Sequence, residues 1–315
     1  MKARLKKITA AGAVALLALA YPLFAPQTLS PRIVEVRRGE RLSDVLDSLK
    51  EGGALRDKAL LKLWLYLGGN QSSLRAGEYR IPAGASVARI AGMLSRGNTL
   101  RRYVTIPEGL TVKQAAAVLD RAEKLSGALP KMPAEGSLLP QTYAYEARAT
   151  KTELVDQMKR AMDEALAREW EARADGLPFK TPREALVLAS IVEKETSLPA
   201  ERTLIAGVFV GRLKRGMRLQ SDPTVVYAIT GGLGHMQGRR LLAKDLEVDS
   251  PYNTYTKGGL PPTPICNPGI ESIRAVLNPA VTGYLYFVAD GSGGHRFAST
   301  LEEHEKNRKE WRKIR

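Results

Sequence analysis

A run of apolar residues at helical spacing lies at residues 184–196, EALVLASIVEKET. On a helix with about 100° between residues, Val187, Leu188, Ile191 and Val192 share one face. Glu195 falls about 40° from Ile191, inside the apolar arc, whereas Glu193 falls on the opposite side. The pattern therefore predicts a helix that ends in two carboxylates lying in environments of different polarity.

A carboxyl group among apolar neighbours is harder to ionise, so its pKa rises and it can deliver a proton near neutral pH. Glu195 is therefore the candidate catalytic acid, and Glu193 and Thr196 are candidate supporting residues. The alternative interpretation is an ordinary helix end whose last turn faces solvent.

Further patterns follow in the second half of the chain. Amphipathic or charged helical patterns occur at residues 153–173, 200–214, 272–277 and 301–315. Residues 284–289 and 295–297 predict a hairpin around a glycine-rich turn. A short β-like or turn segment is expected at residues 217–227.

Three stretches in the first half run from alternating β-forming residues to a glycine turn, and then to a hydroxyl residue before a helical pattern. The paired glycine and hydroxyl residues are Gly39 and Ser43, Gly84 and Ser86, and Gly109 and Thr111. Each hydroxyl is a good helix N-cap, and their uneven spacing argues against a solenoid. The units resemble small βα glycan-binding modules of the LysM type. A generic α+β packing domain is the alternative.

The N-terminus combines basic residues with an apolar run. Four basic residues among the first seven precede a charge-free stretch, residues 8–31. Its apolar part, residues 8–25, is long enough to span a bilayer as a helix. The positive-inside rule then places everything after Arg32 outside the cytoplasm. Residues 18–20, ALA, could instead be the cleavage site of a secretory signal peptide.

These patterns predict an α+β protein with four parts. They are a cytoplasmic basic tail with a single transmembrane helix at 1–32, a small LysM-like βα domain at 33–125, a connecting segment at 126–150, and a mainly helical catalytic domain with short β segments at 151–315.

Composition narrows the possible chemistry. The formal net charge of +15, from 48 basic and 33 acidic side chains, suits an anionic partner such as nucleic acid, anionic lipid or a cell-wall polymer. The predicted outside location excludes nucleic acid. The single cysteine, Cys266, cannot form an internal disulfide. The histidines, at 235, 295 and 304, lack metal-ligand spacing, so no metal or other cofactor is expected. No Gly-x-Ser-x-Gly elbow is present, which leaves acid–base chemistry by a carboxyl group.

Two clusters of polar and aromatic residues, at 217–227 and 250–255, are candidate sugar-binding loops, and a proline-rich loop follows the second. A sugar ring is rich in hydroxyls at its edge and apolar on its face, so amide, hydroxyl and aromatic groups suit it. The candidate substrate-binding residues are Gln220, Ser221, Asp222, Tyr227, Asn253 and Tyr255. Asp222 could instead cap a turn before Pro223, and both loops could be merely well structured.

Several long, ordered motifs resemble the endolytic murein transglycosylases of the YceG-like family. They are residues 189–196 (ASIVEKET), 217–227 (MRLQSDPTVVY), 252–255 (YNTY), 259–262 (GLPP) and 284–289 (YLYFVA). The resemblance covers essentially the whole chain, including the LysM-like region, and the family's catalytic glutamate maps to Glu195. One departure is Gln141, in residues 135–143 (EGSLLPQTY), where similar proteins usually carry Asp.

The resemblance implies an inner-membrane, single-pass enzyme whose catalytic domain is periplasmic or otherwise extracytoplasmic. It would cut nascent peptidoglycan strands internally and so terminate their elongation. Glu195 would protonate the oxygen between N-acetylmuramic acid and N-acetylglucosamine. As a carboxylate it would then take the proton of the sugar's own 6-hydroxyl, which closes a 1,6-anhydro ring. The implied partners are glycan strands, the inner membrane and glycan-polymerising penicillin-binding proteins.

Two other functions remain open from the sequence. One is a non-enzymatic peptidoglycan-binding scaffold of the cell-wall synthesis machinery. The other is true hydrolysis, which ordinarily uses two carboxyl groups, with Asp222 serving as the second.

Overall fold

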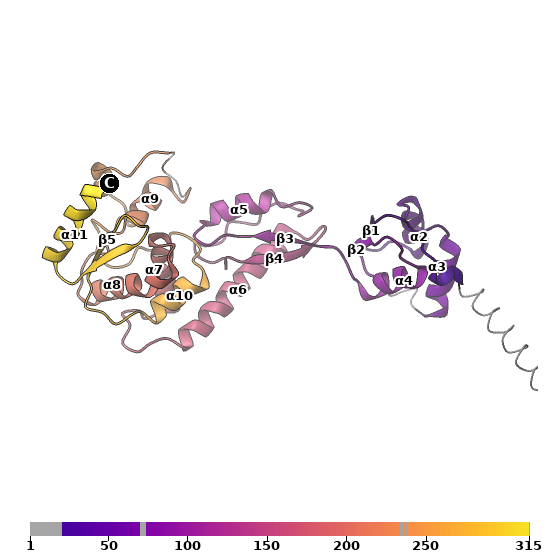
Figure 1. Ribbon diagram of the computed structural model, residues 1–315, viewed down its shortest axis with the longest axis horizontal. Helices are drawn as coiled ribbons and strands as arrows, with labels where there is room; N and C mark the ends of the chain where they lie inside the picture. The colour runs from indigo at the N-terminus through magenta and orange to yellow at the C-terminus, as the bar shows by residue number, and fades with distance from the viewer. Residues whose placement is uncertain (1–20, 70–73, 234–235, 237, 315) are drawn as a thin grey trace, which may run out of the picture. The chain divides into compact units, whose positions relative to one another are not determined.

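The computed structural model describes residues 21–69, 74–233, 236 and 238–314. The basic tail and most of the predicted anchor lie outside these residues, as does His235. Within the described ranges, no helix has both the length and the apolar character needed to cross a membrane. The chain divides into two units, Met1–Arg102 with Ala144–Arg148, and Tyr103–Tyr143 with Ala149–Arg315 (Figure 1). Mixed helices and small sheets confirm the α+β class.

The first unit packs a small sheet against helices. Its elements are β1 (Arg32–Val36), α2 (Leu42–Glu51), α3 (Lys58–Leu67), β2 (Gly77–Ile81) and α4 (Val87–Arg96). The strands pair antiparallel, with Val34 opposite Tyr79. Buried side chains of both strands and all three helices form one apolar core. The helix α3 has no counterpart among the sequence predictions.

Two of the three predicted N-caps are confirmed. Ser86 caps α4 and Thr111 caps α5 (Val112–Asp120), and each hydroxyl accepts a hydrogen bond of 3.3 Å from the third helical N–H. The preceding Gly84 and Gly109 have φ of +73° and +74°. Such angles suit glycine because it lacks a β-carbon.

The cap predicted at Ser43 is wrong. Helix α2 begins at Leu42, so Ser43 lies inside its first turn, and Arg41 occupies the N-cap. The N–H of Arg41 donates to the carboxylate of Asp44 at 3.3 Å. The acidic side chain satisfies an otherwise unpaired N–H and also suits the positive end of the helix dipole.

The observed division differs from the boundary predicted at residues 125–150. The strands β3 (Arg101–Thr105) and β4 (Thr142–Glu146) pair with each other, and the chain passes between the units along them. Asn267 binds the segment between these strands to the rest of the second unit. Its N–H and Nδ2 each donate to the carbonyl of Leu110 at 2.8 Å, and its Oδ1 accepts from the N–H of Leu138 at 3.0 Å. The third strand–turn–helix stretch therefore belongs to the second unit.

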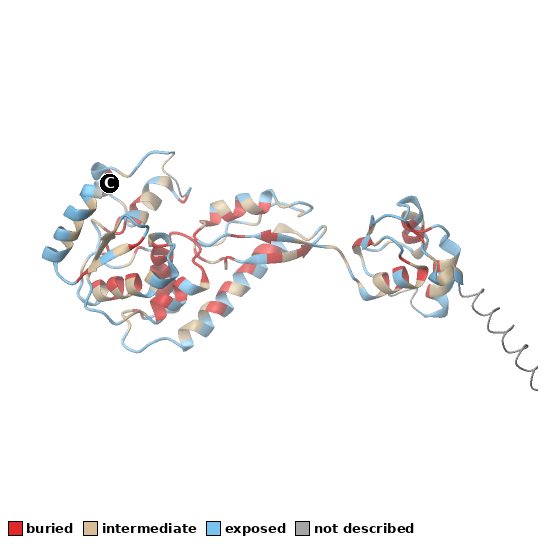
Figure 2. Ribbon diagram, viewed as in Figure 1, coloured by how far each residue is buried: buried red, intermediate tan, exposed pale blue. Residues whose placement is uncertain are grey.

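The second unit is built around α7. After α5, its elements are α6 (Lys151–Glu171), α7 (Pro182–Glu195), η1 (Pro199–Glu201), α8 (Arg202–Lys214), α9 (Asp222–Thr230), η2 (Ala243–Glu247), α10 (Ile270–Leu277), β5 (Tyr286–Ala289), β6 (His295–Ala298) and α11 (Leu301–Ile314). Every residue from 185 to 192 is buried, as Figure 2 shows, because α7 contacts α6, α8, α9 and α10. The predicted helices and hairpin of this half are confirmed.

The β-like segment predicted at residues 217–227 is wrong. Helix α9 begins there at Asp222 and includes Pro223 in its first turn. Proline suits that position because its fixed φ is already helical and no intrahelical N–H is needed. Gln220, with φ of +51°, turns the chain into the helix. The paired valines favoured a strand, but tertiary packing overrides this preference.

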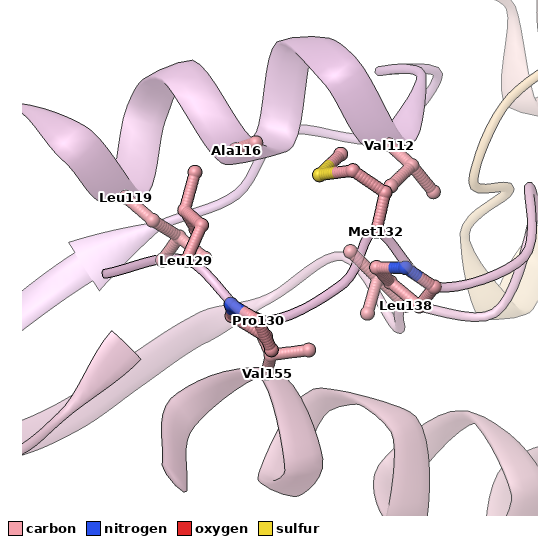
Figure 3. A pocket seen from close by; sticks show the side chains of 9 residues that line it. Val112, Ala116, Leu119, Leu129, Pro130, Met132, Leu138 and Val155 are labelled. Atoms are coloured by element: carbon pink, nitrogen blue, oxygen red, sulfur yellow. The ribbon is translucent and has the colours of Figure 1, made fainter. Parts of the chain in front are cut away.

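An apolar gap separates α5, α6 and the loop between α5 and β4 (Figure 3). It is lined by Val112, Ala116, Leu119, Leu129, Pro130, Met132, Pro133, Leu138 and Val155. Its volume is about 10 Å³, near the lower limit for one water molecule, which would also need polar partners. We interpret it as a packing imperfection of the core.

The two serines provide a matched test of the caps. Ser86→Ala removes the side-chain acceptor at the start of α4 and is expected to lower the free energy of unfolding by about 1 kcal/mol. Ser43→Ala, at an exposed helical position, is expected to change it by less than about 0.5 kcal/mol. Urea unfolding of both variants measures the difference. Equal effects would contradict the assignment of the two caps.

Candidate active site

The site is assembled where α7 ends and α9 begins. Glu195 is the last residue of α7, and its side chain is partly buried. Ser221, only 1% exposed, occupies the N-cap position of α9, and its hydroxyl donates a short hydrogen bond to Oε1 of Glu195. Among the described residues, no hydrogen bond to the other oxygen, Oε2, is found. One oxygen is therefore held by the protein, and the other is open to a ligand.

Burial is the main cause that raises the pKa of Glu195 to about 7. The negative charge of Asp222 also raises this pKa, whereas the hydrogen bond from Ser221 and the positive charge of Arg212 lower it. This agrees with the environment predicted from the helical wheel. A carboxyl group with such a pKa can both give and accept a proton near neutral pH.

A pair of threonines fixes Ser221 and joins the two predicted sugar-binding clusters. The N–H of Ser221 donates to Oγ1 of Thr254 at 3.0 Å. The hydroxyl of Thr224 lies 2.9 Å from that of Thr254 and donates to the carbonyl of Ser221 at 2.7 Å. Both threonines are fully or almost fully buried. Sequence reasoning missed them, although both lie inside motifs that carry the family resemblance.

Asp222 and Tyr255 are brought together beside Glu195. The hydroxyl of Tyr255 donates to Oδ1 of Asp222 at 2.6 Å. Burial, this hydrogen bond and the nearby carboxylates raise the pKa of Tyr255, which keeps the phenol protonated. Asp222 is exposed and is the first residue of α9, a position where the helix dipole favours an acidic side chain.

Arg212 is a buried cation at the site that sequence reasoning missed. The residue is 6% exposed. Its Nε donates to the carbonyl of Leu285 at 2.7 Å and its Nη1 donates to that of Leu219 at 2.6 Å. Its charge favours the ionised form of Glu195. No advance signal marked it in the sequence, because the same helix also carries Arg202 and Lys214.

Asn253 and Gln220, two predicted substrate-binding residues, differ in how far solvent reaches them. Asn253 is fully buried, and its Nδ2 donates to the carbonyls of Leu246 and Val248 at 2.9 and 2.8 Å. Its Oδ1 accepts from the N–H of Tyr255 at 2.9 Å. Asn253 therefore shapes its own loop. Gln220 is exposed, and its N–H donates to the carbonyl of Thr254 at 3.1 Å.

The predicted supporting residue Glu193 faces away from this site. Its Oε2 accepts from the N–H of Gly269 at 3.0 Å and from the hydroxyl of Ser272 at 2.7 Å. It thus satisfies the start of α10. The two glutamates at the end of α7 have separate tasks.

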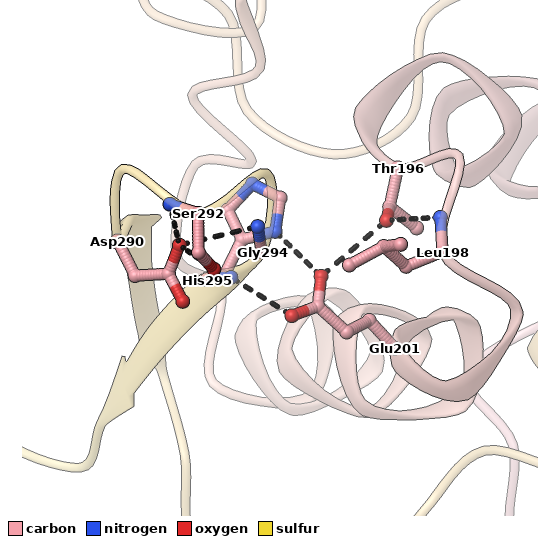
Figure 4. A network of polar contacts seen from close by, with 7 residues as sticks. All are labelled: Thr196, Leu198, Glu201, Asp290, Ser292, Gly294 and His295. Carbon is pink, nitrogen blue, oxygen red and sulfur yellow. Dashed lines mark hydrogen bonds and ion pairs between the residues drawn. The ribbon is translucent and has the colours of Figure 1, made fainter.

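Thr196 supports the turn after Glu195 (Figure 4). Its hydroxyl accepts from the N–H of Leu198 at 3.0 Å and lies 3.4 Å from Oε2 of Glu201. The carboxylate of Glu201 in turn accepts from the N–H of His295 at 2.8 Å and lies 2.7 Å from its Nδ1 (Figure 4). This network binds the end of α7 to the β5–β6 hairpin.

A cleft of about 320 Å³ lies beside Glu195, within the size range of small-ligand sites. Its lining consists of Gly109, Thr111, Lys194, Asp222, Pro223, Val226, Tyr227, Leu241 and Ile265. The neighbours Lys194 and Asp222 contribute to this wall, although Glu195 itself does not. The predicted residue Tyr227 lies here, with its ring centroid 4.9 Å from that of Tyr252.

Within the described ranges, no cluster of His, Cys, Asp and Glu side chains is arranged to hold a metal ion. Cys266 is buried and its thiol donates to the carbonyl of Ser190 at 3.3 Å. The backbone carbonyl of Gln141, at the departure from the family motif, accepts from the N–H of Ile106 at 3.0 Å.

The sequence model of the YceG-like family matches residues 34–310. The chain belongs to the YceG-like family. An endolytic murein transglycosylase of Bacillus subtilis (strain 168) is 30% identical over 309 residues, covering 88% of this chain and 84% of the relative.

Two further similar proteins agree with this membership. An endolytic murein transglycosylase of Streptococcus pneumoniae (strain D39 / NCTC 7466) is 30% identical over 319 residues; the match covers 87% of this chain but only 57% of that relative. A crystal structure of a YceG-like protein from Listeria monocytogenes is 30% identical, covers 88% of this chain and 98% of its own, and has a TM-score of 0.55.

The pKa of Glu195 predicts a pH dependence of stability. The folded state holds this proton up to about pH 7, whereas the unfolded chain releases it near the ordinary value of 4.5. The folded protein thus binds more protons within this window, so stability falls as pH rises through it. Glu195→Gln stays neutral and escapes that loss. Its free energy of unfolding, relative to the parent protein, is expected to rise by roughly 1–3 kcal/mol across the window.

Urea unfolding between about pH 4.5 and 7.5 measures this difference. Glu164→Gln, an exposed position on α6, is the control and is expected to show no such window. A constant difference between Glu195→Gln and the parent protein at all pH values would contradict the raised pKa.

Proposed function

We propose that this chain is an endolytic lytic transglycosylase that cleaves peptidoglycan glycan strands, with Glu195 as its acid and base. The observation that carries the proposal is the geometry of that carboxyl group. It is partly buried, has a pKa of about 7 and is held at one oxygen by Ser221. The names of the Bacillus and Streptococcus relatives support the same reaction class.

In the first step, the protonated carboxyl group of Glu195 gives its proton to the oxygen between N-acetylmuramic acid and N-acetylglucosamine. The C1–O4 bond breaks as the proton arrives, and the sugar ring takes up positive charge. Glu195 becomes a carboxylate. The hydroxyl of Ser221 and the charge of Arg212 both favour this ionised form, so they assist the proton transfer.

In the second step, the carboxylate of Glu195 takes the proton of the 6-hydroxyl on the same muramic acid residue. Oxygen O6 forms a bond to C1, which closes a 1,6-anhydro ring and restores the acid. The nucleophile belongs to the substrate, so neither a water molecule nor a second protein carboxyl group is consumed. A pKa near 7 suits both steps because one group must donate and then accept.

Hydrolysis is the rival reaction, with Asp222 activating water. The carboxylate of Asp222 accepts from Tyr255 at 2.6 Å and lies close enough to Glu195 to raise its pKa. We assign Asp222 and Tyr255 to strand binding and to the electrostatics of Glu195. The rings of Tyr227 and Tyr252 offer an apolar surface in and beside the cleft, as the face of a sugar requires.

We further propose an anchored, extracytoplasmic enzyme that acts on nascent strands beside glycan-polymerising penicillin-binding proteins. The basic residues and apolar run at 1–32 support the anchor and its orientation. The two-stranded sheet and helices of residues 32–96 support a LysM-like module that positions the strand. A non-enzymatic scaffold is the alternative, since the same surfaces could bind glycan without cutting it.

Product analysis on purified peptidoglycan tests the reaction. Glu195→Gln cannot deliver a proton and is expected to reduce the release of anhydro products by a factor on the order of 10² or more. Glu164→Gln, exposed on α6, is the matched control and should retain activity. Unchanged release by a folded Glu195→Gln protein would contradict Glu195 as the acid, and no release by the parent protein would favour the scaffold.

Mass spectrometry of the same products separates the two cleavage reactions. Hydrolysis adds water, so it yields reducing ends about 18 Da heavier than anhydro ends. Products with only reducing ends would contradict the transglycosylase mechanism.

The proposed location has its own test. A reporter enzyme that is active only outside the cytoplasm, fused after Arg315, is expected to be active in the full chain. Deletion of residues 1–25 should abolish that activity, because the apolar run directs export. A reporter active only in the cytoplasm, giving signal with the full chain, would refute the location and both cell-wall functions.

A further inference from the structure

The first turn of α5 binds the C-terminal end of α9 through a series of side-chain hydrogen bonds. The hydroxyl of Thr111 donates to the carbonyl of Gly232. Nζ of Lys113 donates to the carbonyl of Gly231 at 2.6 Å, and Nε2 of Gln114 donates to that of Leu233 at 2.9 Å. Three successive carbonyls after α9 are thus satisfied by three side chains from one helical turn.

Glu135 completes this contact from the loop between α5 and β4. Its Oε1 accepts from the N–H of Val112, the first residue of α5, at 2.8 Å. Its Oε2 accepts from the hydroxyl of Tyr227, on α9, at 3.3 Å. One carboxyl group thus joins both helices. We call Glu135, Tyr227 and the first turn of α5 the α5–α9 clamp.

The clamp connects two segments that line the cleft of about 320 Å³. Gly109 and Thr111 line the cleft from the β3–α5 side, whereas Asp222, Val226 and Tyr227 line it from α9. The same α9 carries Ser221 at its other end, against Glu195. A shift of the C-terminal end of α9 relative to α5 would therefore change the width of the cleft, while Thr254 still holds Ser221 at the other end of α9.

Glu135 differs from Glu195 in how many of its carboxylate oxygens are bound by the protein. Both oxygens of Glu135 accept hydrogen bonds from the protein, whereas Glu195 has Oε2 open. Burial raises the pKa of Glu135 as well. Because both of its oxygens are already bound, the side chain is suited to holding α5 and α9 together and not to transferring a proton. The mechanism above leaves Glu135 unused, and the sequence motif around it drew attention to Gln141 instead.

We propose that Glu135 is a positioning residue that, through the α5–α9 clamp, holds the two segments that line the cleft at the spacing that a glycan strand requires. The kinetic part of this proposal rests on the transglycosylase function; the structural part does not. Because Glu135 acts before the chemical step, its loss weakens strand binding and leaves the ionisation of Glu195 in place.

The test compares two substitutions. Glu135→Ala loses both hydrogen bonds and is expected to raise KM roughly tenfold, with kcat and its pH profile little changed. Glu135→Gln can still accept from Val112 and can donate to the hydroxyl of Tyr227, so its KM is expected to stay close to that of the parent enzyme. A group that transferred protons would behave differently, because glutamine would then be as damaging as alanine.

Tyr227→Phe supplies a second, milder variant that keeps the aromatic ring and loses only the hydroxyl. It is expected to raise KM in the parent protein but to add little in the Glu135→Ala background, since both changes break the same bond. Tyr103→Phe and Glu164→Ala, at exposed positions, are the controls and should leave KM unchanged. An unchanged KM in Glu135→Ala, a large kcat loss in Glu135→Gln, or additive effects of Glu135→Ala and Tyr227→Phe would overturn the proposal.

Hydrogen exchange separates failure of the clamp from failure of the proposed activity. Amides of residues 226–233 are expected to exchange faster in Glu135→Ala than in Glu135→Gln or Glu164→Ala. Unchanged exchange would refute the clamp, even in an active enzyme. Absence of anhydro products from the parent protein would refute the activity alone.

Discussion

The hydrogen bond from Ser221 to Glu195 is the contact on which the arrangement of the second unit depends. It joins the end of α7, whose residues 185–192 are all buried, to the start of α9. Thr224 and Thr254 form hydrogen bonds with the backbone of Ser221. The turn at Gln220 places Ser221 next to Glu195. The strained φ of Gln220 is stabilised by surrounding hydrogen bonds, as expected where a backbone conformation serves a site.

Opposing effects set the proton affinity of Glu195. Burial and the charge of Asp222 favour the neutral acid, whereas Ser221 and Arg212 favour the carboxylate. A single group that both donates and accepts protons needs such a balance, because an excess of either effect would leave one step without its reactive form. The buried guanidinium is itself fixed by two backbone carbonyls, so it supplies charge without occupying the carboxyl group.

The sequence predicted those parts of the site that depend on local periodicity. The apolar arc of α7 placed Glu195 and Glu193 in different surroundings, and they do contact different elements. The sequence failed where packing or hydrogen-bond partners decide the outcome. Residues 217–227 were expected to form a β-like or turn segment, yet helix α9 begins there at Asp222. Asn253 looked like a sugar ligand because polarity alone does not reveal that its amide is used internally. The bond between Thr224 and Thr254 spans 30 residues and leaves no periodic trace.

A raised pKa marks burial and does not by itself mark catalysis. Burial is the largest cause that raises the pKa of Glu108, Glu135 and Glu195 alike. What separates Glu135 from Glu195 is the use of their oxygens. Glu135 has both oxygens bound to protein donors, so a substrate could reach it only by breaking the clamp. Glu195 keeps one oxygen open beside a cleft. The oxygen without a protein partner, together with a pKa near 7, therefore distinguishes Glu195 from Glu135 as the candidate acid.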